Sequence, residues 1–374
     1  MASRFAVLFF GHKQIRCVLF SEGKDRSVFF AEKSIEYDGF SDTGFANPED
    51  VFLKVERLVH SAESENGVVV KRVCCALPSD FFRYGVTEKD LAINGGVVTD
   101  KDVKNLLDHC AVGLPGYTVV EKLPLYYKSF NAPYMVDPVG QVAERLYVTA
   151  SCGYLESRIK ELFDNCAKKL KKEFVLNSYA MLAAKRLDHD FLKGVRRAVI
   201  LFTEGYLDVA LCEGSVPVEV RSIAWGESSV RDALAQLLAC DKETRDLVFK
   251  RVNLNLAFED GDRYRIVGKE YSVKEVNSLV IEAIEYFARE VKKMLADLPK
   301  EDVVVYLTGC DLCENRGVKE LFEDELGKDV YVAVGKEPNI EGCKNYILSA
   351  YAVGTDNGND KSKGLFQKIF YRRK

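Results

Sequence analysis

Two β-strands joined by a tight turn are predicted by the stretch "AVILFTEGYLDVALCEG", residues 198–214. Apolar and β-branched residues on both sides of Gly205 favour strands, and glycine tolerates the backbone conformations that a tight turn needs. A second turn at Gly214 leads to a third predicted strand, Val216–Ile223. This part of the chain therefore predicts an antiparallel three-stranded meander.

A similar stretch, "AVLFFGHKQIRCVLFSEG", opens the chain at residues 6–23. It predicts a strand at Ala6–Phe10, a turn at Gly11, a second strand that ends near Glu22 and a third at Ser27–Ile35. Sequence rich in helix-forming residues follows each meander. The separation is far too long for a solenoid repeat, so the pattern indicates two related domains. The alternative is chance, because hairpins of this composition are common.

Composition narrows the class of protein. A chain of 374 residues is long enough for two domains, and 47% hydrophobic with 29% charged residues is typical of a globular protein. The net charge of −4 gives no general attraction to nucleic acid, so no nucleic acid partner is expected. No apolar run approaches the roughly 20 residues of a membrane-spanning helix, so membrane contact would be peripheral.

The cysteines favour a reducing compartment. Eleven cysteines are scattered along the chain, and the first residues lack the features of a secretion signal, so we expect reduced thiols in the cytoplasm. The sequence "CDLC", residues 310–313, is a lone pair without a second pair at zinc-site spacing. We therefore predict no metal site.

The paired meanders resemble those of the actin, Hsp70 and sugar-kinase superfamily. In that superfamily each half begins with such a hairpin, and the two turns cradle the phosphates of a nucleotide. The resemblance implies an α/β, actin-like two-lobed fold with ribonuclease H-like halves. Small turn residues let backbone N–H groups approach a phosphate, and a turn aspartate usually works with Mg²⁺ and the attacking water.

Six further stretches resemble the FtsA family of bacterial cell division proteins, in the family's order. They are "VCCALPSDFFRYG" (73–85), "VVTDKDVKNLLDHCA" (97–111, with Thr99 as a helix N-cap), "NAPYMVDPVGQVAERLYVTASC" (131–152), "VNSLVIEAIEYFAREVKKML" (276–295), "VVVYLTGCDLCENRGVKELFEDELGKDVYVA" (303–333) and "NYILSAYAVG" (345–354). The resemblance implies an inserted FtsA-type (SHS2) subdomain in the first half. The pilus-assembly protein PilM shares that insertion, so the insertion alone does not choose between the two.

This resemblance divides the chain into named parts. The expected parts are a first actin-like subdomain (1A) at 1–79, the inserted subdomain (1C) at 80–153, a second actin-like subdomain (2A) at 154–226 and 301–354, a smaller subdomain (2B) at 227–300, a flexible linker at 355–364 and an amphipathic membrane-targeting helix at 365–374.

The phosphate-binding turns depart from the superfamily pattern. The second turn normally reads Asp-hydrophobic-Gly-Gly-Gly-Thr-x-Asp, and "LFTEGYLD", residues 201–208, keeps only Gly205 and Asp208. Leu201 stands in place of the metal-linked aspartate, and Glu204 puts a carboxylate where phosphate oxygens would lie, which is repulsive. We therefore expect no efficient hydrolysis, no catalytic residue and no enzyme activity.

Nucleotide binding without hydrolysis remains one interpretation of these turns. The residues that the resemblance assigns to nucleotide binding are Gly11, His12, Lys13, Gly205, Asp208, Gly226 and Gly309. On this interpretation ATP is the cofactor, and it would bind without Mg²⁺ if Lys13 and His12 held the phosphates. The other interpretation is a degenerate pocket in which only the fold survives.

The end of the chain resembles a membrane-binding tail. The polar stretch "TDNGNDKSKG", residues 355–364, is typical of a flexible linker. The last ten residues, "LFQKIFYRRK", place apolar side chains on one helix face with basic neighbours, as in helices that lie in a membrane interface. The residues predicted to contact the membrane are Leu365, Phe366, Lys368, Ile369, Phe370, Arg372 and Arg373. The alternative is a helix docked on the protein's own surface, against which the polar linker argues.

The resemblance to FtsA implies a function in cell division. Such a protein tethers FtsZ filaments to the cytoplasmic face of the inner membrane at the division site and helps to assemble the division ring. The implied partners are the FtsZ C-terminal peptide, further copies of the chain in a filament, an anionic membrane surface and other division proteins. Two other classes stay open: a PilM-like cytosolic scaffold of an envelope or pilus assembly machine, and an active ATPase of the superfamily.

Overall fold

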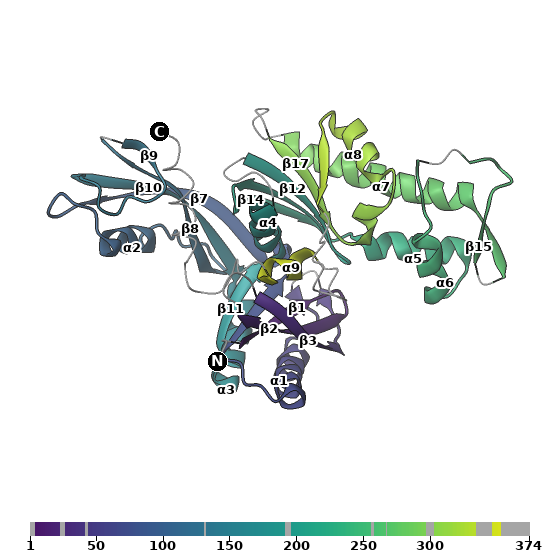
Figure 1. Cartoon of the computed structure of the whole chain (residues 1–374), viewed down its shortest axis with the longest axis horizontal. Helices are drawn as coiled ribbons and strands as arrows, with labels where there is room; N and C mark the ends of the chain where they lie inside the picture. Colours follow the sequence, from purple (N-terminus) through teal and green to yellow (C-terminus); the bar gives the residue numbers. More distant parts are fainter. Residues whose placement is uncertain are drawn as a thin grey trace.

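The structure is a computed structural model that describes residues 4–22, 27–41, 44–130, 132–190, 196–255, 258–266, 268–296, 303–333 and 346–352. The predicted linker and membrane-targeting helix, residues 355–374, lie outside the described residues. Two five-stranded sheets stand one above the other in Figure 1, with a third sheet at one end and a group of helices at the other. None of the described helices is both long and apolar enough to cross a bilayer.

The first sheet has the strand order β11-β6-β1-β2-β3. The first predicted meander is confirmed as β1 (Arg4–Phe10), β2 (Gln14–Glu22) and β3 (Ser27–Glu36), which pair antiparallel. Two distant segments, β6 (Arg72–Leu77) and β11 (Glu173–Ser178), extend it in parallel on the other side of β1.

The second sheet repeats this arrangement. Its meander is β12 (Arg196–Phe202), β13 (Leu207–Glu213) and β14 (Val216–Ile223), and β17 (Val304–Gly309) and β18 (Val330–Ala333) extend it in parallel beside β12. Each sheet thus has three antiparallel strands followed by two parallel ones, in the same order. Two halves of common design, as the sequence predicts, account for this repetition.

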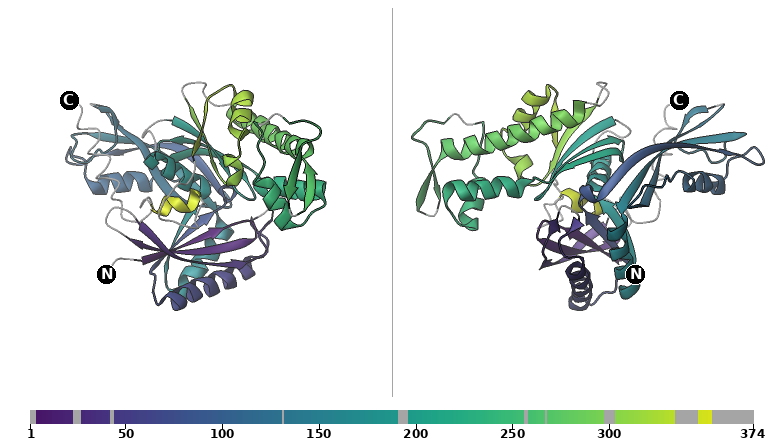
Figure 2. Two further views of the ribbon diagram at one scale, coloured as in Figure 1. Left: turned by 45° about the vertical axis from the view of Figure 1, so that its right-hand side comes forward. Right: turned by 180° about the vertical axis from the view of Figure 1, so that it is seen from behind.

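The two sheets share an apolar core between them. Alternate residues of a strand face opposite sides, so Phe5 and Val7 of β1, together with Val199 of β12, face this shared core. Helices α4 (Tyr179–Asp190) and α9 (Tyr346–Ala352) fill the space between the sheets, as the left view of Figure 2 shows for α9. The lobes are therefore joined by buried apolar surface.

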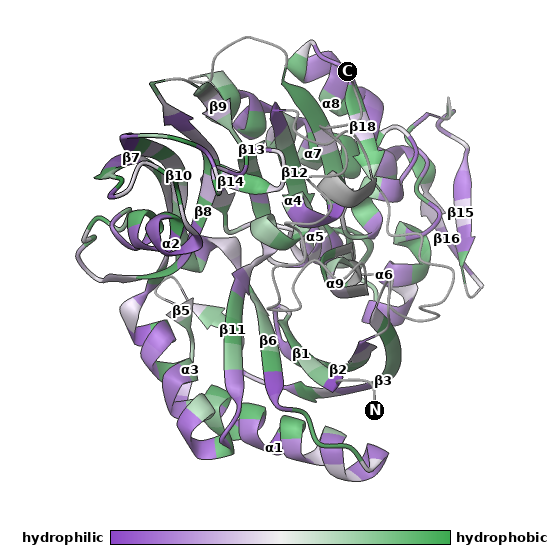
Figure 3. Ribbon diagram, turned by 60° about the vertical axis from the view of Figure 1, so that its left-hand side comes forward, coloured by the Kyte–Doolittle hydropathy of each residue, from purple (hydrophilic) through white to green (hydrophobic). Residues whose placement is uncertain are grey.

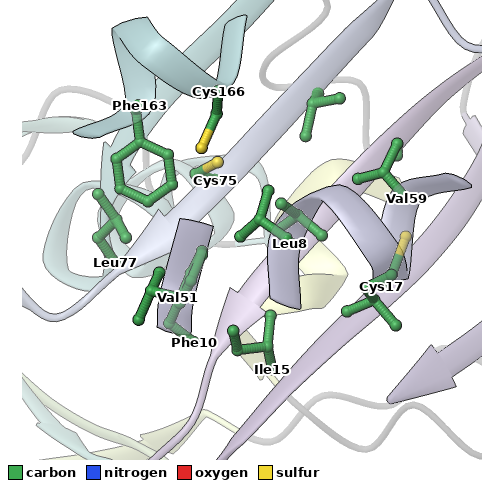
Figure 4. Packing of buried hydrophobic residues seen from close by; sticks show 14 of the residues in the cluster. Leu8, Phe10, Ile15, Cys17, Val51, Val59, Cys75, Leu77, Phe163 and Cys166 are labelled. Carbon is green, nitrogen blue, oxygen red and sulfur yellow. The ribbon is translucent and has the colours of Figure 1, made fainter. Parts of the chain in front are cut away.

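A second core lies on the outer face of the first sheet, under α1 (Pro48–Asn66) and α3 (Ser157–Leu170). Its members in Figure 4 include Leu8, Phe10, Ile15, Cys17, Val51, Val59, Cys75, Leu77, Phe163 and Cys166. Burial raises the pKa of the Cys17 and Cys166 thiols to about 12, so both stay protonated and act as packing groups. Figure 3 shows the apolar strands inside and the mixed hydropathy of both helices outside.

The predicted insertion contains an antiparallel sheet of order β7-β10-β8-β9. Its strands are β7 (Phe82–Ala92), β8 (Tyr117–Ser129), β9 (Ala132–Met135) and β10 (Arg145–Glu156), and α2 (Asp100–Asp108) covers one face. The predicted N-cap is confirmed: the Thr99 side chain accepts from the Asp102 amide, and the Asp102 carboxylate accepts from Thr99. Whether the sheet is of the FtsA type stays a prediction.

The opposite end of the molecule holds α5 (Glu227–Leu238), α6 (Lys242–Phe249), a hairpin of β15 (Arg263–Ile266) and β16 (Lys269–Ser272), and α7 (Val273–Ala296). The predicted amphipathic helix at 276–295 is confirmed by α7, whose apolar face packs on the second sheet and on α8 (Val318–Leu326). Short elements complete the fold: β4 (Phe40–Ser41), β5 (Gly44–Phe45), η1 (Ser79–Phe81) and η2 (Asp311–Glu314).

One boundary differs from the predicted division at residue 154. Strand β11 hydrogen-bonds in parallel to β6, and α3 packs in the outer core of the first sheet. Residues 157–178 therefore belong with the first lobe, although the prediction assigned them to the second. The pairing of β11 with a strand about a hundred residues earlier is not visible in local sequence.

Candidate functional site

A cavity of about 330 Å³ lies where the turns of the two meanders meet, between the lobes. Four of the residues predicted for nucleotide binding line it: Gly11 and His12 from the first turn, Gly205 from the second, and Gly309 from the end of β17. The duplicated design thus brings together residues that are far apart in the sequence. This cavity is the candidate site.

The first turn is closed by backbone hydrogen bonds. The Gly11 amide donates to the Gln14 carbonyl at 2.9 Å, and the Tyr37 hydroxyl donates to the Gly11 carbonyl at 2.7 Å. The Tyr179 hydroxyl donates to the carbonyl of Phe10. Burial is the main cause that raises the pKa of both tyrosines, which keeps their hydroxyls protonated as donors.

The second turn is tied to the start of α5. The Thr203 amide donates to the Tyr206 carbonyl at 2.9 Å, and the amides of Glu227 and Ser228 donate to the Thr203 and Glu204 carbonyls at 3.0 and 2.9 Å. The amides at a helix N-terminus commonly bind anions where they have no partner within the protein. Here the turn's own carbonyls take the two hydrogen bonds.

Gly226 is the residue that permits this close approach. A Cβ atom at this position would lie 2.5 Å from the carbonyl oxygen of Thr203 and 2.6 Å from the amide nitrogen of Tyr206. Gly226 is the N-cap of α5. Its role is contact with the turn behind the cavity, and Gly226 does not line the cavity itself.

The two turns also contact each other. A Cβ atom on Gly205 would lie 3.2 Å from Nδ1 of His12, and one on Gly11 would lie 3.5 Å from a carboxylate oxygen of Glu204. The rings of Phe40 in β4 and Tyr206 in the second turn have their centroids 5.8 Å apart. Side chains from both lobes therefore meet between the turns.

The far wall of the cavity comes from the end of β17. Gly309 has φ of +126°, and a Cβ atom there would lie 1.8 Å from the carbonyl oxygen of Phe202, so only glycine fits. Next to it, the buried Glu227 carboxylate accepts from the Leu312 amide at 2.7 Å and pairs with Arg231 at 2.6 Å. Glu227 thereby fixes α5 to η2.

The other two predicted residues lie outside the cavity lining. Lys13 is exposed in the first turn, where its carbonyl accepts from the Tyr37 amide. Asp208 is fully buried on β13, where it accepts from the Ser222 hydroxyl at 2.6 Å. Burial is the main cause that raises the pKa of Asp208 to about 6, and hydrogen bonds from Ser222 and Ser79 partly oppose it.

Several residues of the site could not be predicted from the turn motifs. Phe40 and Tyr179 line the cavity from outside both turns, and Tyr37 supports the first turn without lining the cavity. No local pattern marks these three residues. Glu227 carried a weak signal, because an acidic residue in the first turn of a helix is favourable whether or not it has a site role.

The residues offer little to a metal. Leu201, in place of the aspartate that the superfamily uses, is buried in the shared core. Within the described ranges, no group of three histidine, cysteine or acidic side chains is placed to hold a metal ion. The role of Gly11, His12, Lys13, Gly205, Asp208, Gly226 and Gly309 in nucleotide binding stays a prediction.

Comparison with known proteins identifies the fold. No family model matches the chain, and no curated protein matches it by sequence. Solved structures do match over nearly the whole length. The chain has the actin-like ATPase fold. One similar structure is the PilM-PilN type IV pilus biogenesis complex, with a TM-score of 0.58, 14% identity and coverage of 95% of this chain and 99% of that chain.

Two further similar structures support the same fold. MreB5 of Spiroplasma citri bound to ADP has a TM-score of 0.55 and 12% identity, with 98% of each chain covered. The ethanolamine utilization protein EutJ from Carboxydothermus hydrogenoformans has a TM-score of 0.52 and 14% identity, with 94% of this chain and 90% of that chain covered. The predicted two-lobed, actin-like α/β class is therefore confirmed.

Proposed function

We propose that this protein is an actin-like scaffold without efficient ATP hydrolysis that tethers FtsZ filaments to the cytoplasmic face of the inner membrane at the division site. The observation that carries the proposal is a fold shared with actin-like ATPases combined with changed phosphate-binding turns. A scaffold needs the lobes but not the hydrolytic residues. The basic, apolar sequence at residues 365–374 supplies the proposed membrane contact.

Membrane attachment in this proposal depends on assembly. Each apolar side chain that is fully buried contributes about 1.5–3 kcal/mol, and burial in an interface is partial. Each basic residue near an anionic surface adds about 1 kcal/mol. One tail would bind reversibly, whereas the tails of a filament of copies would bind firmly through their high effective concentration.

The FtsZ C-terminal peptide is proposed to bind the smaller region at residues 227–300. A shallow groove on α6 is lined by Lys242, Leu247 and Lys250 among others, and these three side chains are exposed. Glu243 and Asp246 complete the lining, and Asp246 is paired with Arg231 and Arg245. The two lysines outnumber the remaining carboxylate, and with the apolar Leu247 they suit a peptide that ends in a carboxylate. Other division proteins would join the same assembly through the inserted sheet and the filament.

Vesicle pelleting tests the membrane part of the proposal. The full chain should pellet with anionic vesicles, and a chain that ends at Gly364 should stay in solution. Phe366→Glu, on the predicted apolar face, should release the full chain, whereas Gln367→Glu adds the same charge on the polar face and should retain most binding. Equal pelleting of the full and shortened chains would refute the tether.

Fluorescence anisotropy with a labelled FtsZ C-terminal peptide tests the partner. Binding should weaken at least fivefold in a Lys242→Glu, Lys250→Glu double variant, which reverses both charges beside the α6 groove. Lys54→Glu, on α1 over the first sheet and outside the groove, serves as the control. A peptide that binds equally to all three proteins, or to none, would remove FtsZ from the proposal.

A PilM-like scaffold is the second candidate, favoured by the structural match over 95% of this chain. Such a protein would bind a peptide from a membrane partner, and deleting residues 365–374 would leave its localisation unchanged. An active ATPase of the superfamily would release phosphate from ATP. Leu201 and Glu204 argue against that activity, which a phosphate-release assay measures directly.

A further inference from the structure

We propose that the cavity between the lobes accepts a nucleoside but excludes its phosphate groups, because side chains of this protein occupy the region where the phosphates would lie. The inference concerns the cavity alone and holds whether or not the chain is a membrane tether. Three independent features support it: the use of the backbone amides, the contacts between the turns, and the charge of the lining.

Five backbone amides at and beside the turns already have acceptors within the protein. A phosphate site needs N–H groups that point into it without an intramolecular partner. In this protein the amides of Gly11, Thr203, Tyr206, Glu227 and Ser228 each donate to an acceptor within the protein. Two of these belong to the first turn of α5, so the helix start offers less to an anion than its position suggests.

Contacts between the lobes fill the space between the turns. The ring of Phe40 packs on Tyr206, and His12 of one turn lies against Gly205 of the other. The hydroxyl of Tyr37, a residue of the first lobe, donates to the Gly11 carbonyl in the first turn. A phosphate chain could enter only if these side chains moved apart.

The charges on the lining disfavour phosphate. Three carboxylates, of Glu204, Glu227 and Asp311, line the cavity. Arg231 pairs with Glu227 at 2.6 Å and lies 3.7 Å from Asp311, whereas Glu204 forms no ion pair with any described residue. The lining also includes Arg16, and its guanidinium pairs with Glu32 at 2.6 Å. An added phosphate would therefore face an uncompensated carboxylate.

The part of the cavity lining next to β17 is mostly apolar. Phe202, Gly309 and Ile347 give that part of the lining an apolar character. The half-buried Cys310 adds a neutral thiol, because desolvation holds the pKa of Cys310 well above its usual value. An uncharged ring with hydroxyl groups suits such a wall better than an anion does. These features point to a nucleoside.

Isothermal titration of the full chain with adenosine, ADP and ATP, each with and without Mg²⁺, tests the inference. We expect adenosine to bind at least tenfold more tightly than ATP, with no gain from Mg²⁺. ATP binding more tightly than adenosine would overturn the inference, and so would a lack of adenosine binding.

Charge variants test the cause. Glu204→Gln should raise the affinity for ATP at least threefold and leave that for adenosine within twofold. Glu213→Gln, at the far end of the same hairpin and outside the cavity, is the matched control and should change neither. Equal effects of the two variants on ATP binding would overturn the role of Glu204. None of these outcomes changes the vesicle-pelleting result. The nucleoside proposal and the membrane-tether proposal can therefore be refuted independently.

Discussion

The substitution Asp208→Asn should stabilise the protein at neutral pH, because it removes a buried charge near the junction of the lobes. Burial is the main cause that raises the pKa of this carboxyl from 3.8 to about 6, and the nearby Asp80 adds to the rise. Hydrogen bonds from Ser222 and Ser79 favour the ionised form and therefore limit the rise in pKa. An amide of similar shape can still accept from Ser222 without a charge.

The magnitude follows from the linkage between proton binding and folding. A raised pKa means that the folded protein holds this proton more tightly than the unfolded chain does. Below 3.8 the carboxyl is neutral in both states, and above about 6 the full cost of the buried charge is present. One pKa unit is worth about 1.4 kcal/mol, so the ionised Asp208 lowers the free energy of unfolding by about 3 kcal/mol near pH 7.5 and about 1.6 kcal/mol near pH 5.

Urea unfolding followed by circular dichroism at these two pH values measures the effect. Asp208→Asn should exceed the wild-type free energy of unfolding at both, and its advantage should shrink by about 1.4 kcal/mol on going to the lower pH. Asp90→Asn, which removes an exposed carboxylate paired with Arg145 on the inserted sheet, should change little at either pH. A difference between wild type and Asp208→Asn that does not vary with pH would refute burial as the cause.

Three further substitutions test particular contacts. Gly309→Ala places a Cβ atom against the Phe202 carbonyl at positive φ and should cost at least about 3 kcal/mol, whereas Gly327→Ala, with open space around it, should cost about 1 kcal/mol; equal losses in thermal unfolding would contradict the steric argument. Thr99→Ala removes the capping box and should cost about 1 kcal/mol, seen as faster amide exchange in α2 but not in α7. Tyr37→Phe leaves the carbonyl of the first turn without its donor and should cost about 1–3 kcal/mol in urea unfolding; an unchanged value would mean that water replaces the hydroxyl.

The meanders could be predicted because their signals are local. In β13 the alternation of residues puts Leu207 and Val209 in the core beneath α7, and Ala210 and Cys212 in the shared core between the lobes. The same alternation would have placed Asp208 on the inner face beside Ala210, away from the turn. The alternation of side chains along the strand therefore predicts that Asp208 is buried. The superfamily motif instead suggested a nucleotide-binding role for its carboxylate.

The parallel strands and the site could not be predicted in the same way. The strand at 173–178 pairs with β6 through contacts that only the folded chain creates, and the division of the lobes therefore differed from the prediction. Tyr179 lines the cavity and Tyr37 donates to its first turn, and the two residues come from separate parts of the sequence. A motif search finds the turns, but the side chains that occupy the space between them are long-range neighbours.

In both halves, the residues that build the fold are different from those that the superfamily motif assigns to nucleotide binding. Both sheets keep one strand order, and in both the central strand, β1 or β12, is apolar on both faces because it lies between two cores. Two buried faces need consecutive hydrophobic residues, and Leu201 is one of them, whereas an ionised aspartate at this position would be costly to bury. Compared with the aspartate of the superfamily motif, Leu201 avoids a buried charge and adds apolar surface to the shared core. In the proposed scaffold, the same residue would leave a metal ion without its carboxylate and would add apolar contact between the lobes.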